Sequence, residues 1–238
     1  MNKNQFDVLV ALQAERKELS LCELLEIVKL SEQDLESILA DFEENGFTQN
    51  GIITNKGLEA LEPYKTKRAI FIAAGFGSRL RPVTYKIPKP LVKVNGVRII
   101  DTLIDGVMAA GIEEIYVVCG YLGEHFQVLK EKYPNIHIVT NNMYNEANNI
   151  SSVYLTRDHL KNAYISEADL LIHNKQIFDK YIYHSCYLGI PTEETDDWYF
   201  KTNDKGVICE LVLEIKIVIV CSVFHIGTQQ MEKDFHNT

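Results

Sequence analysis

The sequence predicts an α/β protein in which a doubly wound, mostly parallel sheet follows a small, mainly helical domain. From residue 68 onward, short apolar runs alternate with amphipathic stretches of helical period, as in parallel strands joined by crossover helices. Before residue 68 the apolar residues recur mostly at helical spacing. We therefore expect two domains, residues 1–66 and residues 67–238.

Charge and cysteine content limit the functional classes. A net charge of −9 argues against a protein whose main task is to grip a nucleic-acid backbone. Five scattered cysteines without a C-x-x-C pair are typical of reduced thiols rather than of a disulfide framework or a zinc site. The N-terminus lacks the apolar core of a signal peptide, and the apolar run 211–224 is too short for a membrane span. We expect a cytoplasmic protein.

Residues 1–66 show the pattern of helices followed by a β-hairpin. A first helix covers residues 6–12, the capping-box pattern at Ser20 begins a second, and Ser31 begins a third that ends at the Asn-Gly pair 45–46. "FTQNGIIT" predicts two short strands around an Asn-Gly turn, and Thr54 caps a last short helix. This order resembles a winged helix.

Charge also decides between two roles for that domain. A winged helix would bind DNA through its third helix, but here that helix is crowded with Asp and Glu and has no Lys or Arg. Residues 1–67 hold seven basic and thirteen acidic side chains, a net charge of −6. A recognition helix must approach phosphates, so we favour a dimerising, docking or regulatory role, possible homodimerisation included, over nucleic-acid binding.

We expect four strands, the first two of them buried, to alternate with three helices in the second domain. The strands are "RAIFIAAG", "EIYVVCG", "IHIVT" and "AYISEAD", and helices are expected at residues 99–110, 123–132 and 151–160. Ligands of such sheets bind outside the carboxyl ends of the strands, so the loops that follow the strands are the candidate site.

The stretch "AAGFGSRLRPVTYKIPKP", residues 73–90, follows the first of these strands. Gly75 and Gly77 let backbone N–H groups turn toward a ligand, and a loop of such donors is an anion cradle. A Rossmann fingerprint would need glycine where Leu80 stands, and a P-loop would need Gly-Lys-Ser/Thr. Together, fixed cations and stiffening prolines in this loop predict a nucleoside triphosphate as the ligand. These cations and prolines are Arg79, Arg81, Lys86, Lys89, Pro82, Pro88 and Pro90.

The motif G-x-G-x-R-L-x-P-x-T, followed by P-K-P-L-V-x-V, resembles the signature of the nucleotidyltransferases that join a sugar or alcohol phosphate to a nucleotide. The resemblance covers roughly residues 68–211 and implies a Rossmann-like fold of the nucleotide-diphospho-sugar transferase type. It implies in-line attack on the α-phosphorus, Mg²⁺ as cofactor and pyrophosphate as leaving group. By resemblance, Arg79 would hold the pyrophosphate, Lys89 would neutralise charge at the α-phosphate or the incoming phosphate, and Asp169, with Glu167 nearby, would bind the metal.

Within that family the chain most resembles bacterial CTP:phosphocholine cytidylyltransferases of the lic type, through "VCGYLGEHFQVLKEKYP", "NEANNISSVYL" and "DDWYF". The resemblance implies that CTP and phosphocholine give CDP-choline and pyrophosphate. The nucleotide contacts implied by resemblance are Ala73, Ala74, Gly75, Gly77, Ser78, Arg79, Gly120, Tyr121, Asn148 and Asn149. Asn148 and Asn149 could instead be turn or N-cap residues.

Trp198 matches an aromatic residue that faces choline in those enzymes, and Lys89 would bind the phosphate of the same acceptor. A quaternary ammonium cannot donate a hydrogen bond, so an aromatic face is its natural receptor. Asp196 and Asp197 would add negative charge. The alternative is that Trp198 only packs against its neighbours.

After about Glu214 the sequence departs from the family pattern, which continues with a glycine-aromatic-tryptophan strand, helices and a second acidic metal ligand. One hypothesis is a frameshift, because codons permitted for residues 223–233, read two bases on, can give I-S-Y-W-N-T-T-D-G-K. A chain without the second carboxylate is expected to bind metal weakly and to turn over slowly. Three other functions stay open: a sugar-1-phosphate nucleotidyltransferase using UTP or dTTP, a ligand-sensing transcription regulator with an inactive transferase-like domain, and an inactive remnant.

Overall fold

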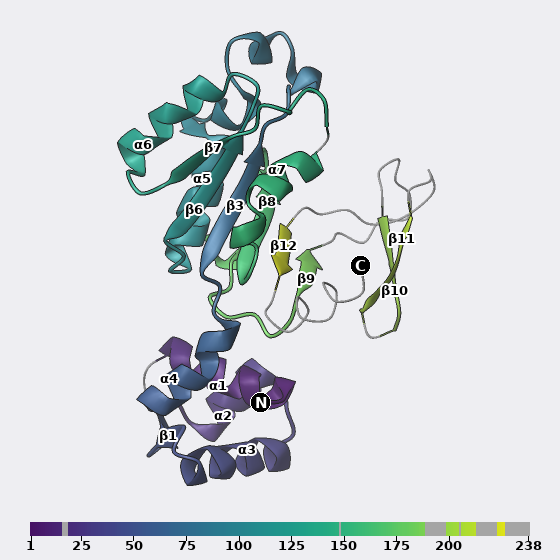
Figure 1. The fold of residues 1–238 in the computed structure, drawn as a ribbon. Coiled ribbons are helices and arrows are strands. Elements are labelled where there is room, and N and C mark those ends of the chain that lie inside the picture. Colours follow the sequence, from purple (N-terminus) through teal and green to yellow (C-terminus); the bar gives the residue numbers. More distant parts are fainter. Residues whose placement is uncertain (16–18, 148, 189–198, 205, 213–222, 227–238) are drawn as a thin grey trace. The chain divides into compact units, whose positions relative to one another are not determined.

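The computed structural model describes residues 1–15, 19–147, 149–188, 199–204, 206–212 and 223–226. The chain forms two compact units, one of Met1–Lys65 with Tyr181–His184 and one of Thr66–Lys180 with Ser185–Thr238 (Figure 1). Several sequence-based expectations lie outside the described residues: those for Asn148, for Trp198 with its acidic neighbours, and for the C-terminal segments 213–222 and 227–238.

The first unit contains the elements predicted from its sequence. Ser20 forms the capping box with Glu23, and the side chains of Ser31 and Thr54 cap the two later helices. The winged-helix assignment itself stays a prediction. In order, the elements are α1 (Lys3–Glu15), α2 (Leu21–Val28), α3 (Glu32–Glu44), the antiparallel pair β1 (Thr48–Gln49) and β2 (Ile52–Ile53), α4 (Asn55–Leu61) and η1 (Glu62–Tyr64).

A short segment from much later in the chain completes this unit. The backbone N–H of Ile182 donates to the carbonyl oxygen of Tyr64 at 2.9 Å. The Tyr183 ring stacks on Tyr64, with centroids 5.5 Å apart and planes at 10°, and it lies 5.3 Å from the ring of Phe6. These aromatic contacts tie Tyr181–His184 to the helical core, which the sequence pattern did not indicate.

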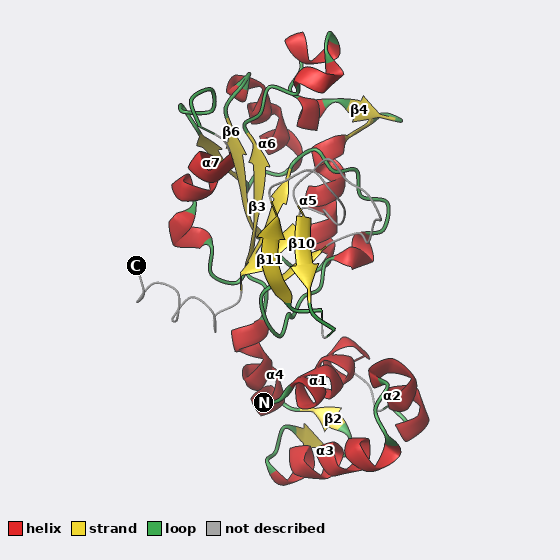
Figure 2. Ribbon diagram, turned by 90° about the vertical axis from the view of Figure 1, so that its right-hand side faces the viewer, coloured by secondary structure: helices red, strands yellow, loops and turns green. Residues whose placement is uncertain are grey.

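The second unit is built on a six-stranded sheet with the order β7-β6-β3-β8-β12-β9. Strands β7, β6, β3 and β8 are parallel, which confirms the predicted doubly wound sheet, and Figure 2 shows α5 and α7 on its opposite faces. The strands of the sheet are β3 (Arg68–Ala73), β6 (Glu114–Cys119), β7 (His137–Thr140), β8 (Ala163–Glu167), β9 (Cys186–Leu188) and β12 (Val223–Ile226).

Two features of the second unit differ from the prediction. The helix expected at residues 151–160 is α7 (Asn149–Leu155) followed by a separate turn, η6 (Arg157–His159). The helix is interrupted at buried Thr156, whose hydroxyl donates to the carbonyl oxygen of Val153 at 3.1 Å. The region 123–132 begins as a 3₁₀ helix, η5 (Gly123–Val128), before α6 (Leu129–Lys132).

The remaining elements lie around the sheet. Strand β12 pairs antiparallel with both β8 and β9, so the sheet is mixed at that edge. Among the described helices, none is long and apolar enough to cross a membrane. The remaining elements are α5 (Ile99–Ala109), η7 (Lys175–Ile177), the hairpin β4 (Lys93–Val94) and β5 (Val97–Arg98), and the antiparallel pair β10 (Tyr199–Thr202) and β11 (Ile208–Val212).

Candidate nucleotide-binding site

Gly77 lies at a tight point of the loop that follows β3. Its φ of +60° is unfavourable for residues with a side chain, and a Cβ built on it would lie 3.0 Å from Cγ2 of Thr84 and 3.1 Å from Cβ of Lys89. The buried Thr84 hydroxyl donates to the Gly77 carbonyl oxygen at 2.9 Å. The loop therefore folds back on itself and holds the base of Lys89 beside Gly77.

Gly75 has a different environment. Its φ is not in the positive region, and a Cβ built on it would have no atom within 4 Å. The protein's own packing therefore does not require glycine here. The open space beside the Gly75 backbone is available to a ligand that approaches it closely.

Two of the four cations that follow the glycines, Arg79 and Lys89, are expected to act on the phosphates. Arg79, in η2 (Ser78–Leu80), is exposed and has no hydrogen-bond or ion-pair partner among the described residues. Lys89 begins η4 (Lys89–Leu91), and its Nζ lies 2.6 Å from Oδ2 of Asp169. Asp169 follows β8, the parallel neighbour of β3, so the carboxyl ends of two adjacent strands bring these charges together.

A second carboxylate lies beside this ion pair. Burial and the negative charge of Asp169 raise the pKa of Glu167 to about 7, and the Lys89 ammonium acts in the opposite direction. Nδ2 of Asn149 donates to Oε1 of Glu167 at 2.6 Å. Asn149, predicted to border the nucleotide, is thus placed next to the acidic pair of the same site.

The pKa of Glu167 predicts a specific pH dependence of stability. A folded-state pKa raised above the ordinary 4.5 means that the folded protein binds this proton more tightly than the unfolded chain. This contribution is fully present below pH 4.5 and is lost as the pH rises toward 7. We expect wild type to lose thermal stability relative to Glu167→Gln between pH 5 and pH 8, in thermal denaturation scans with a chelator present.

The exposed Glu146→Gln is the matched control for that measurement, because it removes a carboxylate elsewhere on the same unit. Its difference in melting temperature from wild type should stay constant across the same pH range. A constant difference for Glu167→Gln as well would show that Glu167 titrates normally.

The loop after β6 packs against the glycine loop. The N–H of Tyr121 donates to the carbonyl oxygen of Ala74 at 3.2 Å, and the Phe76 ring lies 5.3 Å from the Tyr121 ring and 5.4 Å from the Tyr144 ring. A Cβ on Gly120 would lie 2.5 and 2.6 Å from Cβ and Cγ of Tyr144. Sequence reasoning found Gly120 and Tyr121 but missed Phe76 and Tyr144, which carry no motif signal of their own.

Buried Asn141 fixes the start of α7. Its Nδ2 donates to the hydroxyl oxygens of Ser151 at 2.9 Å and Ser152 at 3.0 Å, and its Oδ1 accepts from the N–H of Met143.

The predicted site residues that the structure describes all lie at or after the carboxyl ends of β3, β6 and β8. They are Ala73, Ala74, Gly75, Gly77, Ser78, Arg79, Lys89, Gly120, Tyr121, Asn149 and Asp169.

The fold is a doubly wound α/β domain with a glycine loop after its first strand. The Nucleotidyl transferase family model matches residues 68–183. The structure is similar to that of CTP:phosphocholine cytidylyltransferase from Streptococcus pneumoniae, with a TM-score of 0.66, 33% identity, and 71% of this chain and 74% of that chain covered. The chain belongs to the nucleotidyltransferase family, and the resemblance predicted from the loop motif is confirmed.

Two curated relatives are both named cytidylyltransferases. A 2-aminoethylphosphonate cytidylyltransferase from Lancefieldella rimae is 44% identical over 146 residues, which is 60% of this chain and 59% of that protein. A choline-phosphate cytidylyltransferase from Streptococcus pneumoniae is 36% identical over 150 residues, which is 63% of this chain and 65% of that protein. The chain therefore spans less than two thirds of the length of either curated relative.

Proposed function

We propose that this chain transfers a cytidylyl group from CTP to a small phosphate or phosphonate that bears a cationic nitrogen, releasing pyrophosphate. The observation that carries the proposal is the Lys89–Asp169 pair beside an open glycine loop, at the carboxyl ends of neighbouring parallel strands. Support for CTP comes from the relatives, because both are named cytidylyltransferases.

The chain's own residues supply positioning and charge. Backbone N–H groups around Gly75 would approach the nucleotide phosphates, where no side chain stands in the way. Arg79, which has no protein partner among the described residues, would hold the negative charge that develops on the departing pyrophosphate. Lys89 would exchange its contact with Asp169 for the reacting phosphates. The reaction needs no protein nucleophile.

The acidic pair fits a magnesium ion. Mg²⁺ in nucleotide sites is usually held by one or two carboxylates together with substrate phosphates, and Asp169 with Glu167 offers two carboxylates at one strand end. The described residues contain no group of three or more His, Cys, Asp or Glu placed to hold a metal ion. When bound, Mg²⁺ supplies charge neutralisation at the phosphates.

The acceptors named for the two relatives share two features. Phosphocholine, the acceptor predicted from the sequence, and 2-aminoethylphosphonate both combine a phosphorus oxyanion with a cationic nitrogen. Tyr187 on β9 and Phe200 on β10 form an edge-on aromatic pair with centroids 4.7 Å apart. Aromatic faces attract such cations, and we propose that this pair contributes to the acceptor site.

Pyrophosphate release tests the proposal. CTP, UTP, dTTP and ATP are each offered with Mg²⁺ against phosphocholine, 2-aminoethylphosphonate and glucose-1-phosphate. We expect release with CTP and with phosphocholine, 2-aminoethylphosphonate or both, and the faster acceptor identifies the substrate. Release with UTP or dTTP and glucose-1-phosphate alone would assign the chain to sugar activation instead. The absence of both turnover and thermal stabilisation by CTP would indicate an inactive remnant.

A further inference from the structure

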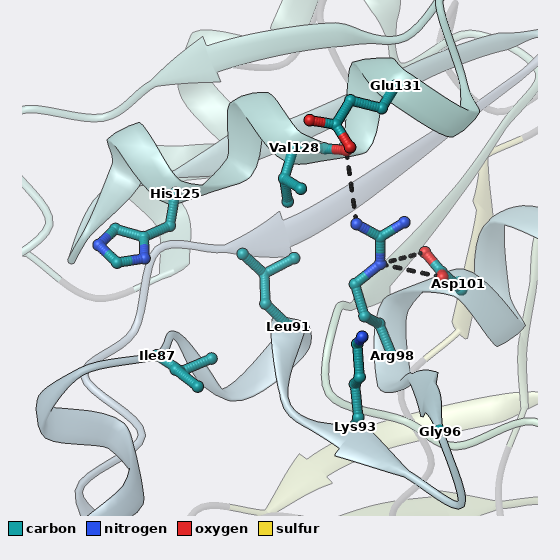
Figure 3. Close-up of a pocket in the computed structure, with 9 residues that line it drawn as sticks. All are labelled: Ile87, Leu91, Lys93, Gly96, Arg98, Asp101, His125, Val128 and Glu131. Carbon is teal, nitrogen blue, oxygen red and sulfur yellow. Dashed lines mark hydrogen bonds and ion pairs between the residues drawn. The ribbon is translucent and has the colours of Figure 1, made fainter.

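A cavity of about 500 Å³ lies in the second unit, and none of Gly75, Gly77, Arg79 and Asp169 lines it. One wall is the β4–β5 hairpin with η4, and the other is η5 with α6 (Figure 3). Its size lies in the range of small-molecule sites. The lining residues are Ile87, Leu91, Lys93, Gly96, Arg98, Asp101, His125, Val128 and Glu131.

The hairpin places two cations side by side. Lys93 and Arg98 are direct cross-strand partners, joined by a tight turn in which Asn95 has a φ of +52° and Gly96 a φ of +84°. Directly opposite residues of an antiparallel pair project from the same face, and like charges in that position repel. Figure 3 shows Nζ of Lys93 next to the Arg98 side chain on the cavity side.

Only one of these two cations is neutralised by the protein. Nε of Arg98 donates to both carboxylate oxygens of Asp101 at 3.0 Å, and Nη1 reaches the carbonyl oxygen of Val128 at 3.5 Å. Nζ of Lys93 has no hydrogen-bond or ion-pair partner in the described part of the chain. A fixed guanidinium beside an unneutralised ammonium favours an oxyanion that contacts both.

The rest of the lining defines the remainder of the ligand. Leu91 and Val128 project into the space between the cation pair and His125, and Ile87 lies on the same side as His125. The second acid of the lining, Glu131, forms no ion pair with Arg98 among the described residues and disfavours further negative charge on the ligand. The geometry points to a binding site for a small organic phosphate or phosphonate, with its single oxyanion on Lys93 and Arg98 and its carbon part against the apolar side chains.

A ligand in this cavity would contact the segment that carries Lys89. Leu91 lies in the same 3₁₀ helix as Lys89, and Lys93 follows four residues after Lys89. A ligand that holds Leu91 and Lys93 therefore restrains the backbone that presents Lys89 to the proposed reaction. The cavity is thus placed to regulate that site as well as to bind.

Amide NMR of the full chain tests the inference, because it locates binding independently of turnover. Phosphocholine, 2-aminoethylphosphonate and inorganic phosphate are titrated separately into wild type, Lys93→Gln and Lys130→Gln, an exposed α6 control outside the lining. We expect saturable shifts at Gly96 and Val128, about tenfold tighter for an organic probe than for inorganic phosphate. Lys93→Gln should weaken binding about tenfold, and Lys130→Gln should leave it unchanged.

Several outcomes would overturn the inference. Shifts confined to Gly75 and Gly77 would place the phosphate in the nucleotide site only. Equal weakening by both lysine substitutions would reveal general electrostatic attraction, and equal affinity for inorganic phosphate would remove the organic part of the ligand. Failure of the proposed transferase reaction has a different signature, because it leaves the shifts at Gly96 and Val128 intact.

Discussion

Replacing Lys89 with glutamine is expected to lower the rate of pyrophosphate release by about 10²–10³-fold. The substitution removes the only positive charge within ion-pair distance of Asp169 among the described residues, at the end of a loop held tightly against Gly77. Glutamine keeps a polar side chain at this partly exposed position, so the fold should persist. Steady-state kinetics with CTP and the preferred acceptor should show a larger change in kcat than in KM, because the charge matters most in the transition state.

Lys130→Gln is the matched control for this measurement. It removes the same charge from an exposed position on α6, so the net charge changes equally while the site is untouched. Its turnover should equal that of wild type. Undiminished activity in Lys89→Gln would show that Lys89 does not act on the reacting phosphates, and equal loss in both variants would trace the effect to overall charge.

Gly120→Ala is expected to lower the free energy of unfolding by about 1–3 kcal/mol. The added methyl group would lie 2.5 Å from Cβ of Tyr144 and 3.0 Å from the carbonyl oxygen of Ala74, and neither atom can move without moving its backbone. The displaced Ala74 begins the glycine loop, so CTP binding should weaken as well. Denaturant unfolding and CTP titration measure the two effects.

Gly75→Ala separates those two effects. A methyl group at Gly75 meets no protein atom within 4 Å, so stability should stay within about 0.5 kcal/mol of wild type. Binding of CTP should nevertheless weaken about tenfold, because the methyl group occupies the space proposed for phosphate. Unchanged CTP affinity in Gly75→Ala would mean that the nucleotide does not approach this loop. Unchanged stability in Gly120→Ala would mean that the loop after β6 can relax freely.

Local sequence patterns predicted most of the fold, because strands and helix starts depend mainly on residues that are neighbours in the sequence. Apolar runs marked β3, β6, β7 and β8, and the side chains at Ser20 and Ser31 marked the starts of two helices. The meeting of Lys89 with Asp169 was also implied, since parallel strands end at one edge of the sheet.

Contacts between distant side chains left no comparable signal. Tyr144 against Gly120 and the hydroxyls bound by Asn141 depend on how loops pack after the sheet has formed. Strand β12 joins the sheet antiparallel between two strands that precede it in sequence, an order that no period or cap reveals. The cation pair of the β4–β5 hairpin was readable in principle, because an Asn-Gly turn places its flanking residues opposite each other.

The aromatic contacts of Tyr183 with Phe6 and Tyr64 set an order of events during synthesis. The first unit leaves the ribosome first, but its core is incomplete until Tyr181–His184 has emerged. At typical elongation rates, on the order of ten seconds pass between the synthesis of the helices of the first unit and that of Tyr181–His184. During that interval the sheet of the second unit can begin to assemble, so the N-terminal unit, although translated first, is completed late.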